Sequence, residues 1–156
     1  MKMHRFEEIW LIFGVAVLVI SMAITGYQAF AQGMGPPSHK ETIDPTQVEN
    51  TAPFDNPGVY QTGENEYEVV MTLQAFSFEP SEITVPKGAE VTFIMTSKDV
   101  IHGVNAPHTN LNTMVVPGQV QRITQTFNES EKFLLICNEY CGTGHQMMSA
   151  TITVEE

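Results

Sequence analysis

The chain has 156 residues, 42% of them hydrophobic, and a formal net charge of −11 at pH 7. Residues 1–31 carry two basic and two acidic side chains, so the whole net charge belongs to the rest of the chain. Such an acidic surface argues against nucleic acid as a partner, because the phosphate backbone would repel it. The roughly 125 residues after position 31 are enough for one domain with a single hydrophobic core.

An apolar segment near the N-terminus predicts a membrane-spanning helix. The stretch 9–31 has no charged residue. At about 1.5 Å of rise per residue, the 22 residues from Ile9 to Phe30 cover roughly 33 Å, which exceeds a hydrocarbon core of about 30 Å. Lys2 and Arg5 precede it, and this bias places the N-terminus in the cytoplasm. We therefore predict a single-pass protein of the cell membrane, with residues 1–31 as anchor and the following domain extracytoplasmic.

A cleavable signal peptide is the alternative for this segment. Ala29-Phe30-Ala31 resembles a small-residue cleavage site after a basic start. The apolar run is, however, longer than the roughly 7 to 15 residues of a signal core, and Glu7 and Glu8 interrupt the basic start. These features favour a retained anchor, and both interpretations place the remaining chain on the same side of the membrane.

The rest of the chain divides into a loop-rich segment and a β-rich segment. Residues 32–65 are rich in Gly, Pro, Asn and Thr, and we interpret them as a linker with irregular structure. Residues 66–156 hold short β-rich runs separated by turn signals, and no helical period. The runs are Tyr67–Leu73, Glu82–Val85, Glu90–Met95, Gln121–Phe127, Lys132–Ile136 and Ala150–Val154. Such a series predicts an all-β sandwich or barrel.

The segment from Cys137 to Met148 concentrates soft metal ligands. It reads Cys-Asn-Glu-Tyr-Cys-Gly-Thr-Gly-His-Gln-Met-Met and contains both cysteines of the chain. Thiolate and thioether are soft ligands and imidazole suits copper, so this set indicates a copper electron-transfer site. A blue copper site uses one Cys. The second thiol, at Cys141, therefore indicates two copper ions that share two bridging thiolates.

Each copper ion needs a terminal donor, so a histidine from elsewhere in the chain is expected. His102 follows the apolar run Val91–Met95 and precedes Gly, and a loop after a strand is where a rigid scaffold presents a functional side chain. His108 is the competing candidate and is less favoured by its loop position. His4 lies before the hydrophobic segment and His39 in a Gly/Pro-rich stretch, so we favour neither.

The pattern Cys-x-Glu-x-Cys-Gly-x-x-His-x-x-Met, with Asp-Val-Ile-His upstream at residues 99–102, resembles the copper motif of cytochrome c oxidase subunit II. Val115-Val116-Pro117-Gly118 extends the match, which covers roughly residues 67–156. The N-terminal anchor fits the short, single-helix form found in B-type haem-copper oxidases. The fixed spacing of so many motif positions makes the resemblance specific.

The resemblance implies a cupredoxin-like Greek-key sandwich that holds a dinuclear copper centre, CuA. The two cysteines would bridge the copper ions, and each histidine would be the terminal ligand of one ion. The methionine and the backbone carbonyl of the glutamate would be weak axial ligands. The implied ligand residues are His102, Cys137, Glu139, Cys141, His145 and Met148. Met147 is out of phase with the motif, and we interpret it as a packing residue.

The resemblance also implies a function and partners. The chain would be subunit II of a haem-copper cytochrome c oxidase, without catalytic residues of its own. It would accept electrons from cytochrome c or another small donor and pass them to the haems of subunit I, where oxygen is reduced. In related oxidases the carboxylate at the position of Glu139 reaches a magnesium ion shared with subunit I. The acidic surface suits a positively charged donor, although docking at a mainly apolar patch is equally compatible with the sequence.

The aromatic residues depart from the pattern of longer subunits II. Those proteins carry a Trp-rich stretch near the copper through which electrons are thought to enter, whereas the single Trp here, Trp10, begins the anchor. The counterpart is Ala75-Phe76-Ser77-Phe78, similar to B-type subunits. Alternating phenylalanines in a strand are more often core residues, so electron uptake through Phe76 or Phe78 is a secondary hypothesis.

Other interpretations of the cysteine segment fit less well. A structural disulfide between Cys137 and Cys141 is common in exported proteins, but it needs neither the following His nor Met. A thioredoxin-fold copper chaperone needs βαβ units, and a nitrous oxide reductase needs a large additional domain. A zinc site would leave Met148 redundant and His102 remote from the other ligands. An exported copper carrier or chaperone outside an oxidase is the alternative function.

Overall fold

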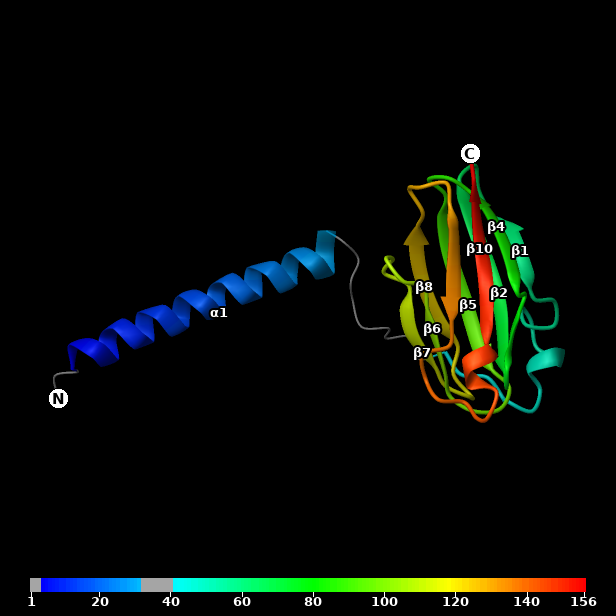
Figure 1. Ribbon diagram of the computed structural model, residues 1–156, viewed down its shortest axis with the longest axis horizontal. Helices are drawn as coiled ribbons and strands as arrows, with labels where there is room; N and C mark the ends of the chain where they lie inside the picture. The colour runs from blue at the N-terminus through cyan, green and yellow to red at the C-terminus, as the bar shows by residue number, and fades with distance from the viewer. Residues whose placement is uncertain (1–3, 32–40) are drawn as a thin grey trace. The chain divides into compact units, whose positions relative to one another are not determined.

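The computed structural model describes residues 4–31 and 41–156, which belong to two separate units, a helix and a β-domain (Figure 1). The helix α1 covers Arg5–Ala31. Its 27 residues have a mean hydropathy of 2.4 in the most apolar window. At about 1.5 Å per residue the helix measures about 40 Å, which is consistent with membrane anchoring. Glu7 and Glu8 lie in its first turn, where negative charge stabilises the helix dipole.

The β-domain consists of ten strands and two short 3-10 helices within the described residues. The strands are β1 (Gly58–Gln61), β2 (Glu66–Gln74), β3 (Ser77–Glu79), β4 (Glu82–Pro86), β5 (Glu90–Ser97), β6 (His102–Asn105), β7 (Asn112–Val115), β8 (Gln121–Thr126), β9 (Lys132–Ile136) and β10 (Ser149–Glu155). The 3-10 helices are η1 (Val48–Asn50) and η2 (His145–Met147).

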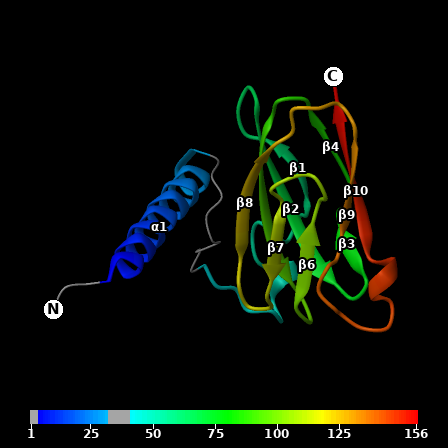
Figure 2. The same cartoon turned by 60° about the vertical axis from the view of Figure 1, so that its left-hand side comes forward.

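The strands form two sheets that face each other, and Figure 2 shows both layers. One sheet has the order β1-β2-β5-β8, with β3 paired to β2, and the other has the order β4-β10-β9-β6-β7. The pairs β2·β5 and β4·β10 are parallel, while the remaining pairs are antiparallel. The predicted all-β sandwich is therefore confirmed.

Alternation of side chains explains why these segments form strands. In β10, Ala150, Ile152 and Val154 are buried, whereas the residues between them are at least partly accessible to solvent. This period of two directs one face of the strand into the space between the sheets. Phe93 and Phe127 fill that space in an edge-to-face contact, with ring centroids 6.4 Å apart.

Four strands were not among the predicted runs, namely β1, β3, β6 and β7. Each has only three or four residues, and β6 contains His, Gly and Asn, which have low strand preference or none. Their pairing depends on neighbours that are distant in sequence, such as Asn105 of β6 opposite Ile136 of β9. Segments too short to show a recognisable periodicity thus form strands through tertiary contacts.

The described part of the expected linker, residues 41–65, differs from an irregular tether. It contains η1 and β1, and Val48 and Phe54 are each only 2% exposed. These two side chains form a second small core on the outer face of the β2-β5-β8 sheet, together with Val70, Ile94 and Val120. Residues 32–40 lie outside the described part, and the division of the chain at residues 31 and 65 stays a prediction.

Polar contacts also attach this segment to the sheet. The Ile43 N–H donates to the Gly118 carbonyl at 3.1 Å, and the Val120 N–H donates to the Glu41 carbonyl at 3.0 Å. Lys98 pairs with Glu49 at 3.0 Å. The residues from Glu41 onward therefore belong to the folded domain.

Replacing Phe54 with Ala should lower the free energy of unfolding by about 3 kcal/mol, because the substitution leaves a cavity in this second core. The measurement is urea denaturation of the chain in detergent micelles, followed by circular dichroism. Asp55→Ala, an exposed neighbour in the same segment, is the control and should change the value by less than about 0.5 kcal/mol. Equal effects of the two substitutions would show that the segment is not packed on the sheet.

Candidate metal centre

Three strand ends meet at one end of the sandwich and carry the predicted ligands. His102 is the first residue of β6, Cys137 follows the end of β9, and Met148 precedes the start of β10. Because β9 and β10 are paired antiparallel, the loop between them returns to its starting point, and the Cys137 N–H donates to the Met148 carbonyl at 3.2 Å. This loop lies at the bottom of the domain in Figure 1, opposite the C-terminus.

A glycine lets the loop lie directly against β6. A Cβ atom at Gly103 would collide with Asn138 Oδ1 and lie 2.8 Å from the backbone nitrogen of Glu139. Only glycine leaves room for the backbone that carries these two residues. The close approach fixes the cysteine loop beside the histidine strand.

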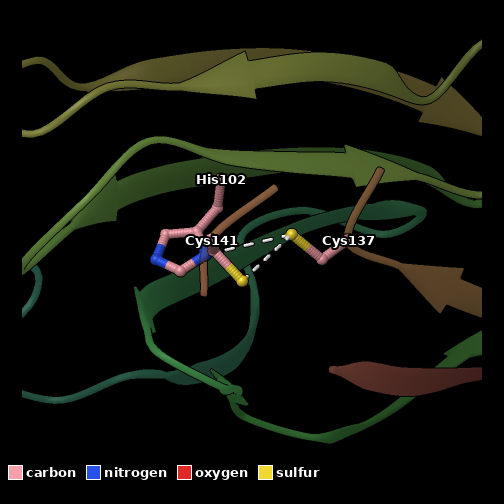
Figure 3. A group of neighbouring side chains, drawn as sticks. All are labelled: His102, Cys137 and Cys141. Carbon is pink, nitrogen blue, oxygen red and sulfur yellow. Dashed lines mark hydrogen bonds between the residues drawn. The ribbon is translucent and has the colours of Figure 1, made fainter. Parts of the chain in front are cut away.

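The cluster of His102, Cys137 and Cys141 is buried, with 0%, 6% and 8% exposure respectively. Their donor atoms all lie within 4.8 Å of one another, and Figure 3 shows the three side chains pointing toward one another. The Cys137 Sγ atom is 3.9 Å from His102 Nδ1 and 3.9 Å from Cys141 Sγ. Both cysteines are free thiols, so the structure does not contain the alternative disulfide.

The remaining implied ligands also contact the two sulfur atoms. Cys141 Sγ is 3.6 Å from His145 Nδ1 and 3.7 Å from Met148 Sδ. Cys137 Sγ donates to the backbone carbonyl of Glu139 at 3.2 Å. The structure therefore brings together all six residues that the sequence analysis named, with one histidine in contact with each sulfur.

The competing histidines are placed elsewhere. His108 lies in the turn between β6 and β7, at the far end of β6 from His102, and it has a positive φ of 67°. It lines a polar cavity of about 330 Å³ whose other walls include Glu129 and Glu131. His4 precedes α1 in the helical unit, and His39 lies outside the described residues.

The two phenylalanines proposed for electron uptake have different surroundings. Phe78 is 3% exposed and belongs to the main core, whereas Phe76 is 38% exposed. The ring of Phe76 lies on the ligand loop, because a Cβ atom at Gly144 would be 2.5 Å from its Cδ2 atom.

Met147, interpreted as a packing residue, is instead 75% exposed. In the 3-10 turn η2 it projects away from the core, while its neighbour Met148 is 2% exposed.

Asp99 is a polar residue of this site to which the sequence analysis gave no role. Its carboxylate accepts hydrogen bonds from the Ala75 N–H at 2.7 Å and the Val100 N–H at 2.6 Å, and it contacts His102 Nε2 at 2.9 Å. Partial burial alone would raise the pKa of Asp99, but these hydrogen bonds outweigh it, so the pKa lies below its ordinary value. The sequence feature that could have indicated a role for Asp99 is its Asp-x-x-His spacing to His102.

Burial has the opposite effect on Cys141. It raises the pKa of this thiol from 9.0 to about 11, and the neighbouring Cys137 adds to the increase through a hydrogen bond and charge repulsion. In the metal-free chain Cys141 is therefore a protonated thiol at neutral pH. A bound cation would have to displace this proton, since metals bind the thiolate.

The metal-free chain should lose stability between pH 9 and about pH 11. In this range the unfolded state has released the Cys141 proton, whereas the folded state still holds it, so the free energy of unfolding falls as pH rises. Urea denaturation under reducing conditions at several pH values measures the slope. Cys141→Ser should have a shallower slope over the same range, and equal slopes would contradict the assignment.

Comparisons with known proteins show the family of this chain. The family model of the cytochrome c oxidase subunit II periplasmic domain matches residues 66–155. Cytochrome c oxidase subunit 2 of Thermus thermophilus is 41% identical, and the alignment covers 99% of this chain and 97% of that protein. The chain belongs to the cytochrome c oxidase subunit II family. The family expected from the sequence resemblance is thereby confirmed.

Structural comparison extends the family assignment to the whole described fold. A subunit in a cryo-EM structure of a heme-copper terminal oxidase dimer matches with a TM-score of 0.79 and 28% identity, covering 97% of this chain and 100% of that one. The cupredoxin-like sandwich with one N-terminal helix is thus confirmed. The nitrous-oxide reductase of Cupriavidus necator is 31% identical over 63% of this chain, but the match covers only 16% of that protein. Subunit II of the oxidase family therefore accounts for far more of the chain.

Proposed function

We propose that this subunit II chain binds two copper ions between Cys137 and Cys141 and that this CuA centre carries electrons into a haem-copper oxidase. The observation that carries the proposal is the 3.9 Å separation of the two free sulfur atoms. Half of this separation is shorter than a metal–thiolate bond of about 2.3 Å. An ion bonded to both sulfurs would therefore lie to one side of the line between them, which leaves the opposite side for a second ion.

The other donors complete two similar environments. His102 Nδ1 lies next to Cys137, and His145 Nδ1 lies next to Cys141, so each ion would have one terminal nitrogen. Met148 Sδ and the Glu139 carbonyl would be weaker additional ligands. When bound, the pair of ions supplies a one-electron redox centre. The chain's own residues contribute two negative thiolates, a largely buried location and a loop fixed between paired strands.

We propose that the chain is anchored in the cell membrane by α1, with the N-terminus in the cytoplasm and the copper domain outside. The length and hydropathy of α1 support the anchor, and the basic residues before it support the orientation. The partner would be subunit I of the oxidase, which would receive the electrons at its haems. No catalytic residue is assigned to this chain.

The donor is proposed to be cytochrome c or a similar small electron carrier that docks mainly through apolar contacts. Phe76, Tyr140 and Met147 are 38%, 74% and 75% exposed around the ligand loop, and the Tyr140 ring is 5.8 Å from the His145 ring. Phe76 is retained as the proposed contact for electron uptake, whereas Phe78 is in the core. An aromatic and thioether surface of this kind suits contact with the exposed edge of a haem group.

Part of the acidic charge lies far from the ligand loop, although Glu139 and Asp99 lie at it, so apolar contacts are proposed to contribute more to docking than long-range steering. Seven acidic residues lie on segments at the opposite end of the sandwich: Glu64, Glu66, Glu90, Glu129, Glu131, Glu155 and Glu156. In β2, Glu66 is separated from Leu73 by roughly 23 Å of strand at about 3.3 Å per residue. The Debye length at physiological ionic strength is about 8 Å, so salt screens these charges from a partner at the copper end.

Glu139 is also proposed as a ligand of a magnesium ion shared with subunit I. Its side chain is exposed, while its carbonyl faces Cys137. One residue could thus supply a hard carboxylate oxygen outward and a carbonyl oxygen inward, and Mg²⁺ prefers carboxylate and water oxygens.

Replacing Cys137 with Ser should abolish the dinuclear centre, because a shared electron needs both bridging sulfurs. The wild-type chain in detergent should bind two copper ions and show the paramagnetic hyperfine pattern of one electron shared by two equivalent nuclei. The variant should lose that pattern and bind at most one ion. His108→Ala is the control and should keep both properties. Uptake of a single ion by the wild-type chain would contradict the proposal, as would survival of the shared-electron spectrum in Cys137→Ser.

Co-purification with a haem-containing subunit distinguishes an oxidase subunit from an independent copper carrier.

Electron uptake should depend more on Phe76 than on salt. Phe76→Ala should lower the second-order rate of reduction by reduced cytochrome c by about tenfold, because it removes part of the apolar contact. Raising the ionic strength to a physiological value should change the wild-type rate by less than about threefold. Stopped-flow absorbance measures both, with Ser77→Ala as the neighbouring control. A steep fall with salt and no effect of Phe76→Ala would show that charges guide the donor.

A further inference from the structure

We propose that Asp99 is a positioning residue that fixes the ring of His102 and ties it to the Ala75–Phe76 turn over the ligand loop. This inference rests on the proposed copper centre. Its basis is that a single carboxylate contacts the backbone N–H of Ala75, the backbone N–H of Val100 and the imidazole of His102, in addition to the hydroxyl of Ser97. The turn that contains Ala75 lies between β2 and β3, whereas His102 begins β6.

The first consequence concerns the imidazole of His102. A carboxylate is only an acceptor, so the 2.9 Å contact with Asp99 Oδ1 requires the hydrogen to be on Nε2. The lone pair of Nδ1 then faces Cys137 Sγ, 3.9 Å away, where copper would bind. The His102 side chain is 0% exposed, so water does not compete for Nε2. A carboxylate on the distal nitrogen of a metal-binding histidine sets its tautomer and increases its basicity.

The second consequence concerns Phe76. Asp99 Oδ2 accepts the hydrogen bond of Ala75, the residue directly before Phe76, at 2.7 Å. The Phe76 ring in turn lies on Gly144, one residue before His145. Asp99 thus connects β6, which carries His102, to the Phe76 ring, which lies on the loop that carries His145. Loss of the carboxylate would leave both the His102 ring and the Phe76 ring less firmly held.

Asp99 is not simply the counter-ion of its neighbour Lys98. The Lys98 ammonium pairs with Glu49 at 3.0 Å and with Glu79 at 3.6 Å. Among residues 4–31 and 41–156, the ion pairs of Asp99 within 4.0 Å do not include a Lys or Arg. Its polar contacts instead go to backbone amides, to Ser97 and to the histidine. That pattern is expected of a residue that orients a ligand.

The test compares Asp99→Asn with Glu79→Gln in the full chain in detergent. Both variants remove one negative charge near Lys98, but only the first removes the carboxylate from His102. Asp99→Asn should still bind two copper ions, with an affinity lower by about 10- to 100-fold in competition with a Cu(I) chelator. Its reduction potential should shift to a more positive value, because a less basic histidine stabilises the oxidised ions less. Glu79→Gln should change the affinity by less than about threefold.

A measurement on the unmodified chain keeps the proposal testable if Asp99→Asn fails to fold. Nitrogen-15 spectra of the metal-free chain, with the signals of His102 identified by their loss in His102→Gln, report the tautomer directly. The Nε2–H form, with slow exchange against solvent, is expected. The Nδ1–H form would overturn the inference, and so would equal affinities and potentials in Asp99→Asn and Glu79→Gln. Failure of the wild-type chain to bind two copper ions would instead overturn the proposed function.

Discussion

The arrangement of the site depends on two unbonded sulfur atoms held 3.9 Å apart in a mostly buried position. Two thiols at this range would ordinarily form a disulfide in an oxidising compartment. Here the pairing of β9 with β10 and the Cys137 to Met148 backbone hydrogen bond close the loop independently of the sulfurs. The loop is therefore closed without a bond between the two sulfurs, both of which are free thiols.

Much of the fold could be predicted because its central strands are long enough to show their period. The runs at β2, β5 and β10 alternate or are continuously apolar, and each was recognised from its own residues. The short strands β1 and β6 have no such local signature, since their pairing partners lie elsewhere in the chain. The same reason explains why Val48 and Phe54 were placed in a linker, although their side chains pack on the sheet.

The candidate site was predictable to the extent that its ligands lie in one loop. The spacing of the ligand residues from Cys137 to Met148 indicates a copper site even when the fold is unknown. The contacts of Phe76 and Asp99 could not be derived in this way, because they arise where the β2–β3 turn meets the loop before β6. Likewise, sequence alone could not decide that Phe78 points into the core and Phe76 does not, since that depends on the register of β3 against β2.

The exposure of Tyr140 and Met147 has a consequence for how such a subunit could diversify. Both side chains lie within the ligand loop, yet each is about three-quarters exposed and contributes little to the interior. Substitutions there would alter the shape and polarity presented to the proposed electron donor at little cost in stability. One scaffold could accordingly be adapted to different electron carriers while its inner coordination chemistry stayed unchanged.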